Sequence, residues 1–344
     1  MRPEETALEQ RFHDALARDR TRAPEWMTRW DYQEGLKKRK RTYEDGVVSD
    51  FFQFGGAEDL LKWMSWFRTD YPDYINDARI TALVHASRTN DERVVRSLGL
   101  QLDAAVYDKR VGLNNAHDHL LPQAYPVPER AGIRTMLDFG AGYGRQANLW
   151  TGQDADLCYI GMDAIVNSYC LQHLYYKGLG VPCADYIDTP DAFQLDPRKA
   201  GIQHLPTWRS DLIPSASVDL VMCVQVLPEL NSRLVRHMIG EFKRVLKPGG
   251  AFYIRDHAYT WKPTDNFDVE AHLTANGFDL EYRAHVINDV EIHGIPRIWR
   301  KSLPDVIASR KRTWKQRVDQ AVVDVDTLTG GGFKRTLRKL KGKA

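Results

Sequence analysis

The chain has 344 residues, of which 43% are hydrophobic and 27% charged, and its formal net charge is +2. This composition is typical of a folded globular protein and excludes a disordered chain, a collagen and a small disulfide-stabilised domain. The apolar runs are shorter than the ~20 residues of a membrane-spanning helix, and the first ten residues are polar and acidic, so we expect a cytoplasmic protein.

Residues 1–128 are predicted to form a mostly helical section that acts as a lid or contributes to substrate binding. Apolar residues at helical spacing predict one helix near residues 57–67, and residues 77–98 are a second candidate. A connector with three prolines, at residues 121–130, marks the boundary with the next domain.

His117 and His119 flank Asp118 near the end of this section. On a strand, alternate residues share a face, so both imidazoles would reach one site. Two interpretations remain open, a contact with cofactor or acceptor and a hydrogen-bonded linker. A metal ion would need further ligands, which the sequence does not identify. The four cysteines lack metal-binding spacing, so we predict free thiols and no metal site.

Residues 129–303 alternate between apolar strands and helices, which predicts an α/β domain with a doubly wound, mostly parallel sheet. The helix ending near Leu246 is followed by Lys247-Pro248-Gly249-Gly250, a sequence that stops helices. The predicted strands are 134–139, 157–162, 218–226, 251–255, 278–286 and 297–303, and the predicted helices begin at 145, 168, 233 and 267. Residues 177–202 are too long for a simple connection, which is typical of a functional loop.

A glycine-rich turn, Gly140-Ala141-Gly142-Tyr143-Gly144, lies between the first of these strands and its helix. Glycine lets the backbone turn sharply and approach a ligand, but dinucleotide-binding folds share this pattern. Asp138 precedes the turn, and a carboxylate there suits a cationic ligand better than a pyrophosphate. Asp163 ends the second strand, where a carboxylate can accept two ribose hydroxyls.

Together with the glycine turn and the two aspartates, the pattern of residues 134–300 resembles the class I S-adenosylmethionine-dependent methyltransferases. Proteins of this class have a Rossmann-like fold with a seven-stranded sheet. Four segments carry the resemblance in order: MLDFGAGYGR, YIGMDA, SVDLVMCVQVLPEL and FKRVLKPGGAFYIRDH. The resemblance implies S-adenosyl-L-methionine as cofactor and an antiparallel hairpin that closes the sheet. A dinucleotide oxidoreductase or an inactive relative is the alternative.

The resemblance also implies roles for single residues. The turn residues Gly140, Gly142, Tyr143 and Gly144 would lie along the methionine part of the cofactor, with Asp138 near its ammonium group. Asp163 would hold the ribose. For the adenine, Asp211 or Trp208 is expected, and a solvent-facing loop is the alternative for both. Gln225 ends the fourth strand, where the backbone commonly lines the cofactor.

Methyl transfer to a hydroxyl gains from a base, and ligands bind at the carboxyl ends of parallel strands. Two residues meet these conditions. His257 follows the fifth strand and can act as a base near neutral pH, and Glu229 follows the fourth and could assist it or bind a hydroxyl. Local hydrogen bonding is the alternative for both.

A looser resemblance, carried by GAGYGR, the later Glu229-Leu230 and the long helical start, is to sugar O-methyltransferases of glycan biosynthesis. The family's Glu-x-Gly-Gly-Gly is Asp-Phe-Gly-Ala-Gly here. Aromatic residues in the expected substrate-facing sections could stack on sugar rings: Trp63, Trp66, Tyr175, Tyr176, Tyr186 and Trp261. For Trp63 the alternative is a place in the hydrophobic core. A methyltransferase acting on RNA or protein, and a non-catalytic module that binds the cofactor, are the competing hypotheses.

Two segments of the chain are strongly basic. From Arg297 to Ala344 there are 14 Lys/Arg against 4 Asp/Glu, so an acidic body carries a basic tail, predicted to be helical over 304–344. The tail is interpreted either as a peripheral contact with an anionic membrane, which would suit a lipid-linked glycan substrate, or as a solvated terminus. Nucleic acid is a third candidate partner for the tail. Lys37–Arg41 is either a localisation or phosphate-binding patch or a solvated face.

Overall fold

The computed structural model describes residues 1–20, 42–43, 46–47, 54–65, 77–124, 132–230, 232–256, 267–284 and 294–302, and every structural statement below concerns these residues. For 42–43, 46–47 and Glu229 only the backbone is described. The proline connector from residue 125, Trp66, His257, Trp261, Lys37–Arg41 and the basic tail therefore lie outside the described residues.

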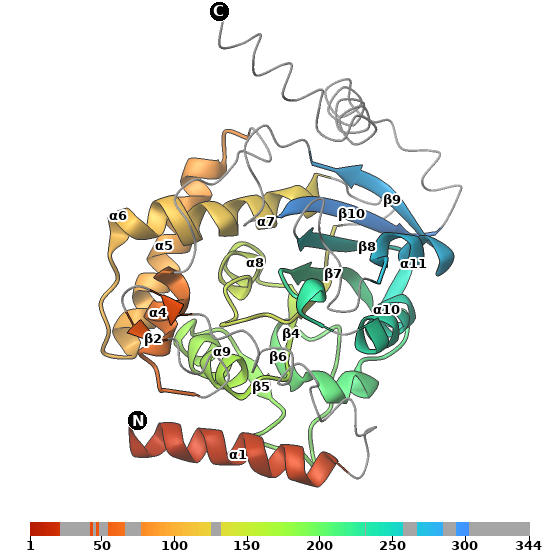
Figure 1. Cartoon of the computed structure of the whole chain (residues 1–344). Helices are drawn as coiled ribbons and strands as arrows, with labels where there is room; N and C mark the ends of the chain where they lie inside the picture. The colour runs from red at the N-terminus through yellow and green to blue at the C-terminus, as the bar shows by residue number, and fades with distance from the viewer. Residues whose placement is uncertain are drawn as a thin grey trace, which may run out of the picture.

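An eight-stranded sheet forms the centre of the molecule (Figure 1). Its first six strands in spatial order run parallel, and the last two are antiparallel to their neighbours. In that order the strands are β5 (Cys183–Asp185), β6 (Gly201–Pro206), β4 (Cys158–Asp163), β3 (Thr135–Phe139), β7 (Val218–Val224), β8 (Leu246–Asp256), β10 (Ile295–Lys301) and β9 (Phe278–Arg283). A separate two-residue pair joins β1 (Thr42–Tyr43) and β2 (Gly46–Val47).

This order confirms the predicted α/β, Rossmann-like fold and its antiparallel closing hairpin, with eight strands where seven were expected. The extra strand is β5, which pairs with β6 at the edge of the sheet. Residues 177–202, interpreted as a long loop, thus contain a strand and lead directly into β6. Sequence analysis missed both strands because β5 has only three residues and β6 carries the polar side chains of Gln203 and His204.

The helices that follow the strands begin and end close to the predicted residues. Helix α10 illustrates the reason, because its buried side chains recur every three or four residues and form one apolar face. Phe242 on this face packs on Phe139 of β3 and Phe252 of β8. The helices after β3 are α8 (Ala147–Gln153), α9 (Val166–Gly178), α10 (Ser232–Val245) and α11 (Val269–Ala275), with short helices η2 (Thr207–Leu212) and η3 (Leu227–Glu229). Residues Lys247–Gly250 end α10 as predicted and form the start of β8.

Apart from the short β1–β2 pair, the N-terminal section is mostly helical where it is described. It contains α1 (Pro3–Asp19), α4 (Asp59–Ser65), α5 (Ile80–Ser97), α6 (Ala104–Tyr107), the π-helix η1 (Asp108–Gly112) and α7 (Leu113–Gln123). Helix α1 packs beside α9, as Figure 1 shows, and α5 packs on α7, α8 and α9. Leu8, Phe12 and Ala15 of α1 belong to the same hydrophobic core as the sheet. This packing brings the N-terminal helices to the domain that holds the glycine turn.

Helix α7 contains both histidines of the predicted cluster. Because His117 and His119 lie on a helix, the strand geometry expected for them is wrong. Among the described residues, no helix is both long enough and apolar enough to cross a membrane.

Candidate functional site

The glycine turn begins where β3 ends, at the edge of the sheet where the parallel strands present their carboxyl ends. The backbone N–H groups of Gly140 and Ala141 donate to the carbonyl oxygen of Met162 on β4, at 2.9 and 3.1 Å. All three glycines have positive φ, at 67°, 60° and 92°. A Cβ atom at Gly144 would lie 2.5 Å from the ring of Tyr176, and one at Gly140 would overlap Val226. The turn therefore requires glycine at both ends for space as well as for conformation.

Asp163, the predicted ribose ligand, ends β4 directly beside the turn. Its Oδ1 accepts from the backbone N–H groups of Ala164 (2.8 Å) and Ile165 (3.0 Å), and its carboxylate also accepts a backbone hydrogen bond from Gly142. Burial raises the pKa of Asp163 to about 7 in spite of these hydrogen bonds. The ribose contact remains a prediction, and the structure shows that the same carboxylate holds the turn.

Gln172 of α9 completes this support, and sequence analysis missed it. Its Nε2 donates to the carbonyl oxygen of Gly142 at 2.7 Å and to Oδ2 of Asp163 at 3.3 Å. The N–H of Gly142 is thus hydrogen-bonded to Asp163 of β4 and its carbonyl oxygen to Gln172 of α9. The signal was weak, because a single glutamine within a helix gives no indication of its partner.

Asp138, predicted near the cofactor's ammonium group, lies in β3 beneath the turn and is 2% exposed. Its Oδ2 accepts a 2.6 Å hydrogen bond from the hydroxyl of Tyr159. Burial raises the pKa of Asp138 to about 6, although the nearby charge of Arg145 acts in the opposite direction. A cation bound close to this carboxyl would favour its ionised form. The ammonium contact itself stays a prediction.

Tyr143, the remaining turn residue of the prediction, is buried in an aromatic cluster. Its ring packs edge-to-face on Tyr175, with centroids 5.3 Å apart, and on Trp63 of α4, at 6.4 Å. Tyr175 and Tyr176 are fully buried. The proposal that these two tyrosines stack on a sugar is therefore wrong, because their rings form the packing beneath the turn.

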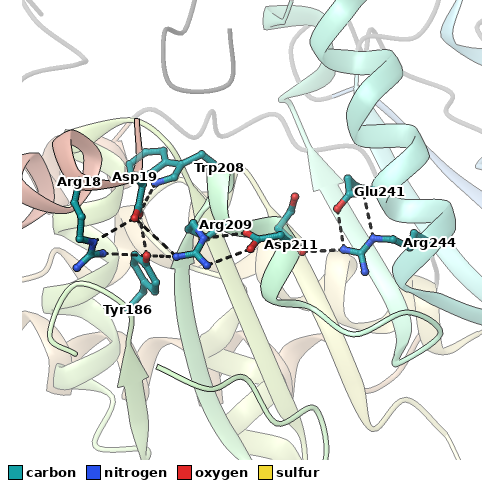
Figure 2. A network of polar contacts seen from close by, with 9 residues as sticks. Arg18, Asp19, Tyr186, Trp208, Arg209, Asp211, Glu241 and Arg244 are labelled. Atoms are coloured by element: carbon teal, nitrogen blue, oxygen red, sulfur yellow. Dashed lines mark hydrogen bonds and ion pairs between the residues drawn. The ribbon is translucent and has the colours of Figure 1, made fainter. Parts of the chain in front are cut away.

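The adenine end was assigned to Asp211 or Trp208, both in η2 after β6 (Figure 2). Trp208 is buried, and its Nε1 donates to Asp19 of α1 at 3.0 Å, so the solvent-facing alternative is wrong for it. The side chain of Asp211 is 62% exposed and is held by two hydrogen bonds from Arg209, at 2.9 and 3.1 Å. Of the two, Asp211 has the exposure that a ligand contact requires.

The same network excludes Tyr186 as a sugar platform. Its hydroxyl donates to Asp19 at 2.9 Å, and its ring is covered by the guanidinium groups of Arg18 and Arg209, at 5.5 and 5.0 Å from the centroid. On the other side of η2, Arg244 of α10 donates to the carbonyl oxygen of Ser210 at 2.9 Å. Figure 2 shows that η2 is thereby fastened to α1 and to α10.

The predicted catalytic residues follow β7 and β8 in the sequence, and these two strands end side by side, where Val224 pairs with Arg255. Gln225 has a φ of 58°, which is unusual for a residue other than glycine, and its N–H donates to the carbonyl oxygen of Arg255 at 3.0 Å. Glu229 ends η3, a few residues further, and buried Asp256 ends β8 directly before His257. The register thus brings Gln225 beside Arg255, near the last described residue before His257, and both catalytic roles stay predictions.

A buried ionic cluster next to these strands was missed. Asp118 of α7 accepts hydrogen bonds from Arg145 (2.6 Å), Gln146 (3.0 Å), Tyr253 (2.6 Å) and Arg255 (2.7 and 2.8 Å). Burial alone would raise the pKa of Asp118, but the charges of Arg255 and Arg145 hold it well below its usual range. The available signal was Arg255 near the end of the apolar run of β8, since a buried charge must find a partner.

The two histidines beside Asp118 do not form a metal site in this structure. The ring of His119 packs edge-to-face on Trp150, with centroids 4.7 Å apart, and burial lowers the pKa of His119 to about 4. His117 is completely buried. No group of three His, Cys, Asp or Glu side chains suited to a metal ion occurs in the described part of the chain.

Comparisons with known proteins give one family match and several similar solved structures. Residues 137–254 match a family described as a methyltransferase domain. A solved S-adenosylmethionine-dependent methyltransferase from Methanosarcina mazei is similar at 15% identity, covering 49% of this chain and 92% of that one, with a TM-score of 0.35. Another, from Aquifex aeolicus, is similar at 17% identity, covering 49% and 82%, with a TM-score of 0.37. No curated protein matches the sequence.

Proposed function

We propose that this enzyme, whose residues 137–254 match a methyltransferase domain and whose cofactor is S-adenosyl-L-methionine, methylates a hydroxyl group of a sugar. The enzyme class and the cofactor are those predicted from the sequence, and the domain match confirms them. The acceptor is the new element of the proposal.

The residues of the glycine turn fit the cofactor. The three glycines give the turn the positive φ angles that its sharp bend after β3 requires. Two buried carboxyls, Asp138 and Asp163, have pKa values raised by burial, and a cationic ligand that can donate hydrogen bonds would stabilise their ionised forms. Asp163 would hold the ribose and Asp138 the ammonium end, with Asp211 available for the adenine.

The bound cofactor supplies an activated methyl group on a cationic sulfur. The chain has to place an acceptor oxygen in line with that group, exclude water and accept the acceptor's proton. We assign the proton to His257, which follows β8, and a supporting role to Glu229, which follows β7. When the acceptor oxygen gains the methyl group it loses its proton, and His257 would take that proton up.

The adjacent ends of β7 and β8 are the observation that carries the choice of a hydroxyl acceptor. The β7–β8 register pairs Val224 with Arg255, so Gln225, which begins the turn leading to Glu229, lies beside the end of the strand that precedes His257 in the sequence. Carboxylate and imidazole groups suit hydroxyls, which donate to one and lose a proton to the other. The sugar class rests on the resemblance of the GAGYGR turn and the Glu229-Leu230 loop to sugar O-methyltransferases. Because the three buried tyrosines are excluded as platforms, sugar stacking is not part of the argument.

To test the proposal, the purified protein is incubated with S-adenosylmethionine that carries deuterium in its methyl group. Acceptor mixtures of sugar nucleotides and oligosaccharides, of RNA and of protein are compared by mass spectrometry. We expect the labelled methyl group on a sugar oxygen, and the corresponding glycan to lose one methyl increment in cells without the gene. Label only in RNA or protein would refute the sugar acceptor. Cofactor binding without turnover on any mixture would favour the non-catalytic module.

A further inference from the structure

Trp63 of helix α4 lies directly above the middle of the glycine turn. A Cβ atom built on Gly142 would lie 3.3 Å from Cζ3 of the Trp63 ring. The same ring packs edge-to-face on Tyr143, the next residue of the turn. Because Asp163 and Gln172 hold the backbone of Gly142 from below, Gly142 is enclosed between α9 and β4 on one side and Trp63 on the other.

The segment that carries Trp63 is fastened at its beginning to helix α1. Glu5 accepts from the backbone N–H of Ala57 at 3.0 Å and from the side chain of Arg2 at 2.7 Å. Asp59 accepts from the N–H of Gly55 at 2.7 Å, which fixes the bend that precedes α4. The position of Trp63 is therefore set by specific contacts.

The end of α4 is fastened as well. Arg110, in the π-helix η1, donates to the carbonyl oxygen of Ser65 at 2.5 Å. On α4 itself, Leu60 and Met64 point into the core, whereas Trp63 is only partly buried. An aromatic ring that is held in place, partly accessible and above a ligand-binding turn has the properties of a contact surface for the ligand.

We propose that Trp63 is a cofactor-binding residue, which covers the methionine end of the cofactor and favours its cationic sulfur. The physical basis is the attraction between a positive charge and the face of an aromatic ring, which is strongest for tryptophan. The inference rests on S-adenosylmethionine being the cofactor and does not depend on which acceptor is methylated. It also gives the N-terminal section a direct part in binding.

Two ligands separate this role from ordinary packing. S-adenosylmethionine carries the sulfonium charge, and S-adenosylhomocysteine has the same adenosine, ammonium and carboxylate groups with a neutral sulfur. A tryptophan that only supports the turn would affect both ligands equally. A tryptophan that favours the sulfonium would affect the charged ligand more.

The experiment measures both affinities by calorimetry in the full-length protein and in Trp63→Leu and Trp63→Phe. We expect Trp63→Leu to reduce the preference for S-adenosylmethionine over S-adenosylhomocysteine by roughly 3- to 30-fold, and Trp63→Phe to retain most of it. Trp299→Leu is the matched control, because Trp299 is a buried tryptophan of β10, and strands β7 and β8 separate β10 from β3 and its turn. It should leave the preference unchanged.

A second measurement does not require the leucine variant to fold. In wild-type protein labelled with 5-fluorotryptophan, the fluorine resonance missing from the Trp63→Phe spectrum identifies Trp63. We expect this resonance to shift when S-adenosylmethionine is added. An unshifted resonance, or equal weakening of both ligands in Trp63→Leu, would overturn the role of Trp63 alone. Failure of the wild-type protein to bind either ligand would instead overturn the cofactor assignment, and the inference with it.

Discussion

Gln172 donates a 2.7 Å hydrogen bond to the carbonyl oxygen of Gly142, and this bond ties helix α9 to the middle of the glycine turn. The same amide nitrogen reaches Asp163, the predicted ribose ligand, at 3.3 Å. One side chain therefore sets both the backbone of the turn and the orientation of the carboxylate beside it. Such preorganisation reduces the ordering that a ligand must bring about when it binds.

Asp163→Asn should weaken cofactor binding by roughly 10- to 100-fold, because a hydrogen bond to a charged group contributes about 1.5–3 kcal/mol. The amide keeps the shape of the side chain but removes its negative charge. Calorimetric titration with S-adenosylmethionine measures the change. Asp188→Asn is a control, since Asp188 is an exposed acid that pairs with Arg11 and Lys177 away from the turn. Equal affinity of Asp163→Asn and wild type would show that the wrong acid was chosen.

Cofactor affinity should fall as the solution is acidified. Burial raises the pKa of Asp163 to about 7 and that of Asp138 to about 6, so both carboxyls become protonated in the free protein as the pH falls through these values. A cationic ligand prefers the ionised forms, and its binding must then release protons. Titrations over a pH series should show the affinity decreasing below about pH 7. In Asp163→Asn the decrease should begin nearer pH 6, and an unshifted profile would contradict the assignment.

The raised pKa values also have a consequence for stability without the cofactor. The ordinary pKa of an aspartate is near 4, whereas the pKa of Asp163 in the folded protein is about 7. Between these two pH values the unfolded chain has released the proton of Asp163 and the folded protein still holds it. The stability of the folded protein therefore falls as the pH rises through this range. We therefore expect the cofactor to stabilise the protein most at the upper end of this range, which thermal unfolding with and without ligand can measure.

Gly144→Ala should destabilise the protein more than Gly180→Ala. Both glycines have positive φ, at 92° and 67°, so alanine costs about 1–2 kcal/mol of backbone strain at either position. Only at Gly144 would the new Cβ also meet a side chain, Tyr176 at 2.5 Å, whereas the space around Gly180 is open. Overpacking adds about 1–3 kcal/mol. Urea unfolding compares the two variants, and equal losses would show that the turn needs glycine for its conformation alone.

His257→Ala should lower the turnover number by about 100-fold or more and leave cofactor affinity near normal, because a base acts on the acceptor's proton and not on the cofactor. Initial rates on the acceptor identified by the labelling experiment, together with calorimetry, separate the two effects. Glu229→Gln tests the supporting role, for which we expect a smaller loss. Full activity of His257→Ala would refute the assignment of the base.

The fold could be predicted from local sequence patterns wherever apolar residues determine the element. The strands β3, β4, β7 and β8 are apolar runs, and α10 has a regular apolar face. Strand β6 was missed because its polar side chains acquire partners only after folding. His204 on β6 and His173 on α9 both lie 2.7 Å from the same carboxylate oxygen of Asp185, on β5. No pattern in the sequence links these three residues.

In the candidate site, too, the residues that are close in sequence could be predicted, and those that meet only in the folded protein could not. The glycine turn and the carboxylates before and after it are close in sequence and could be identified as a motif. Trp63, Gln172 and Asp118 act on the turn and its surroundings across long sequence separations, and Asp118 lies 137 positions before Arg255. Contacts of this kind depend on the three-dimensional arrangement of α4, α7 and α9, which spacing alone does not specify.

Asp118→Asn should be far more destabilising than Asp91→Asn, although both carboxyls are completely buried. The charges of Arg255 and Arg145 outweigh burial and keep the pKa of Asp118 low, so Asn would leave two buried arginines without their counter-charge at a cost of about 3–5 kcal/mol. At Asp91, burial outweighs the hydrogen bonds of Tyr107, Tyr175 and Asn148 and raises the pKa to about 6, so a neutral amide should cost only about 1 kcal/mol. Chemical denaturation at neutral pH measures both losses. If the two variants lost the same stability, the ion pairs of Asp118 would contribute no more than the neutral hydrogen bonds of Asp91, and α7 would be held to β8 chiefly by its apolar contacts.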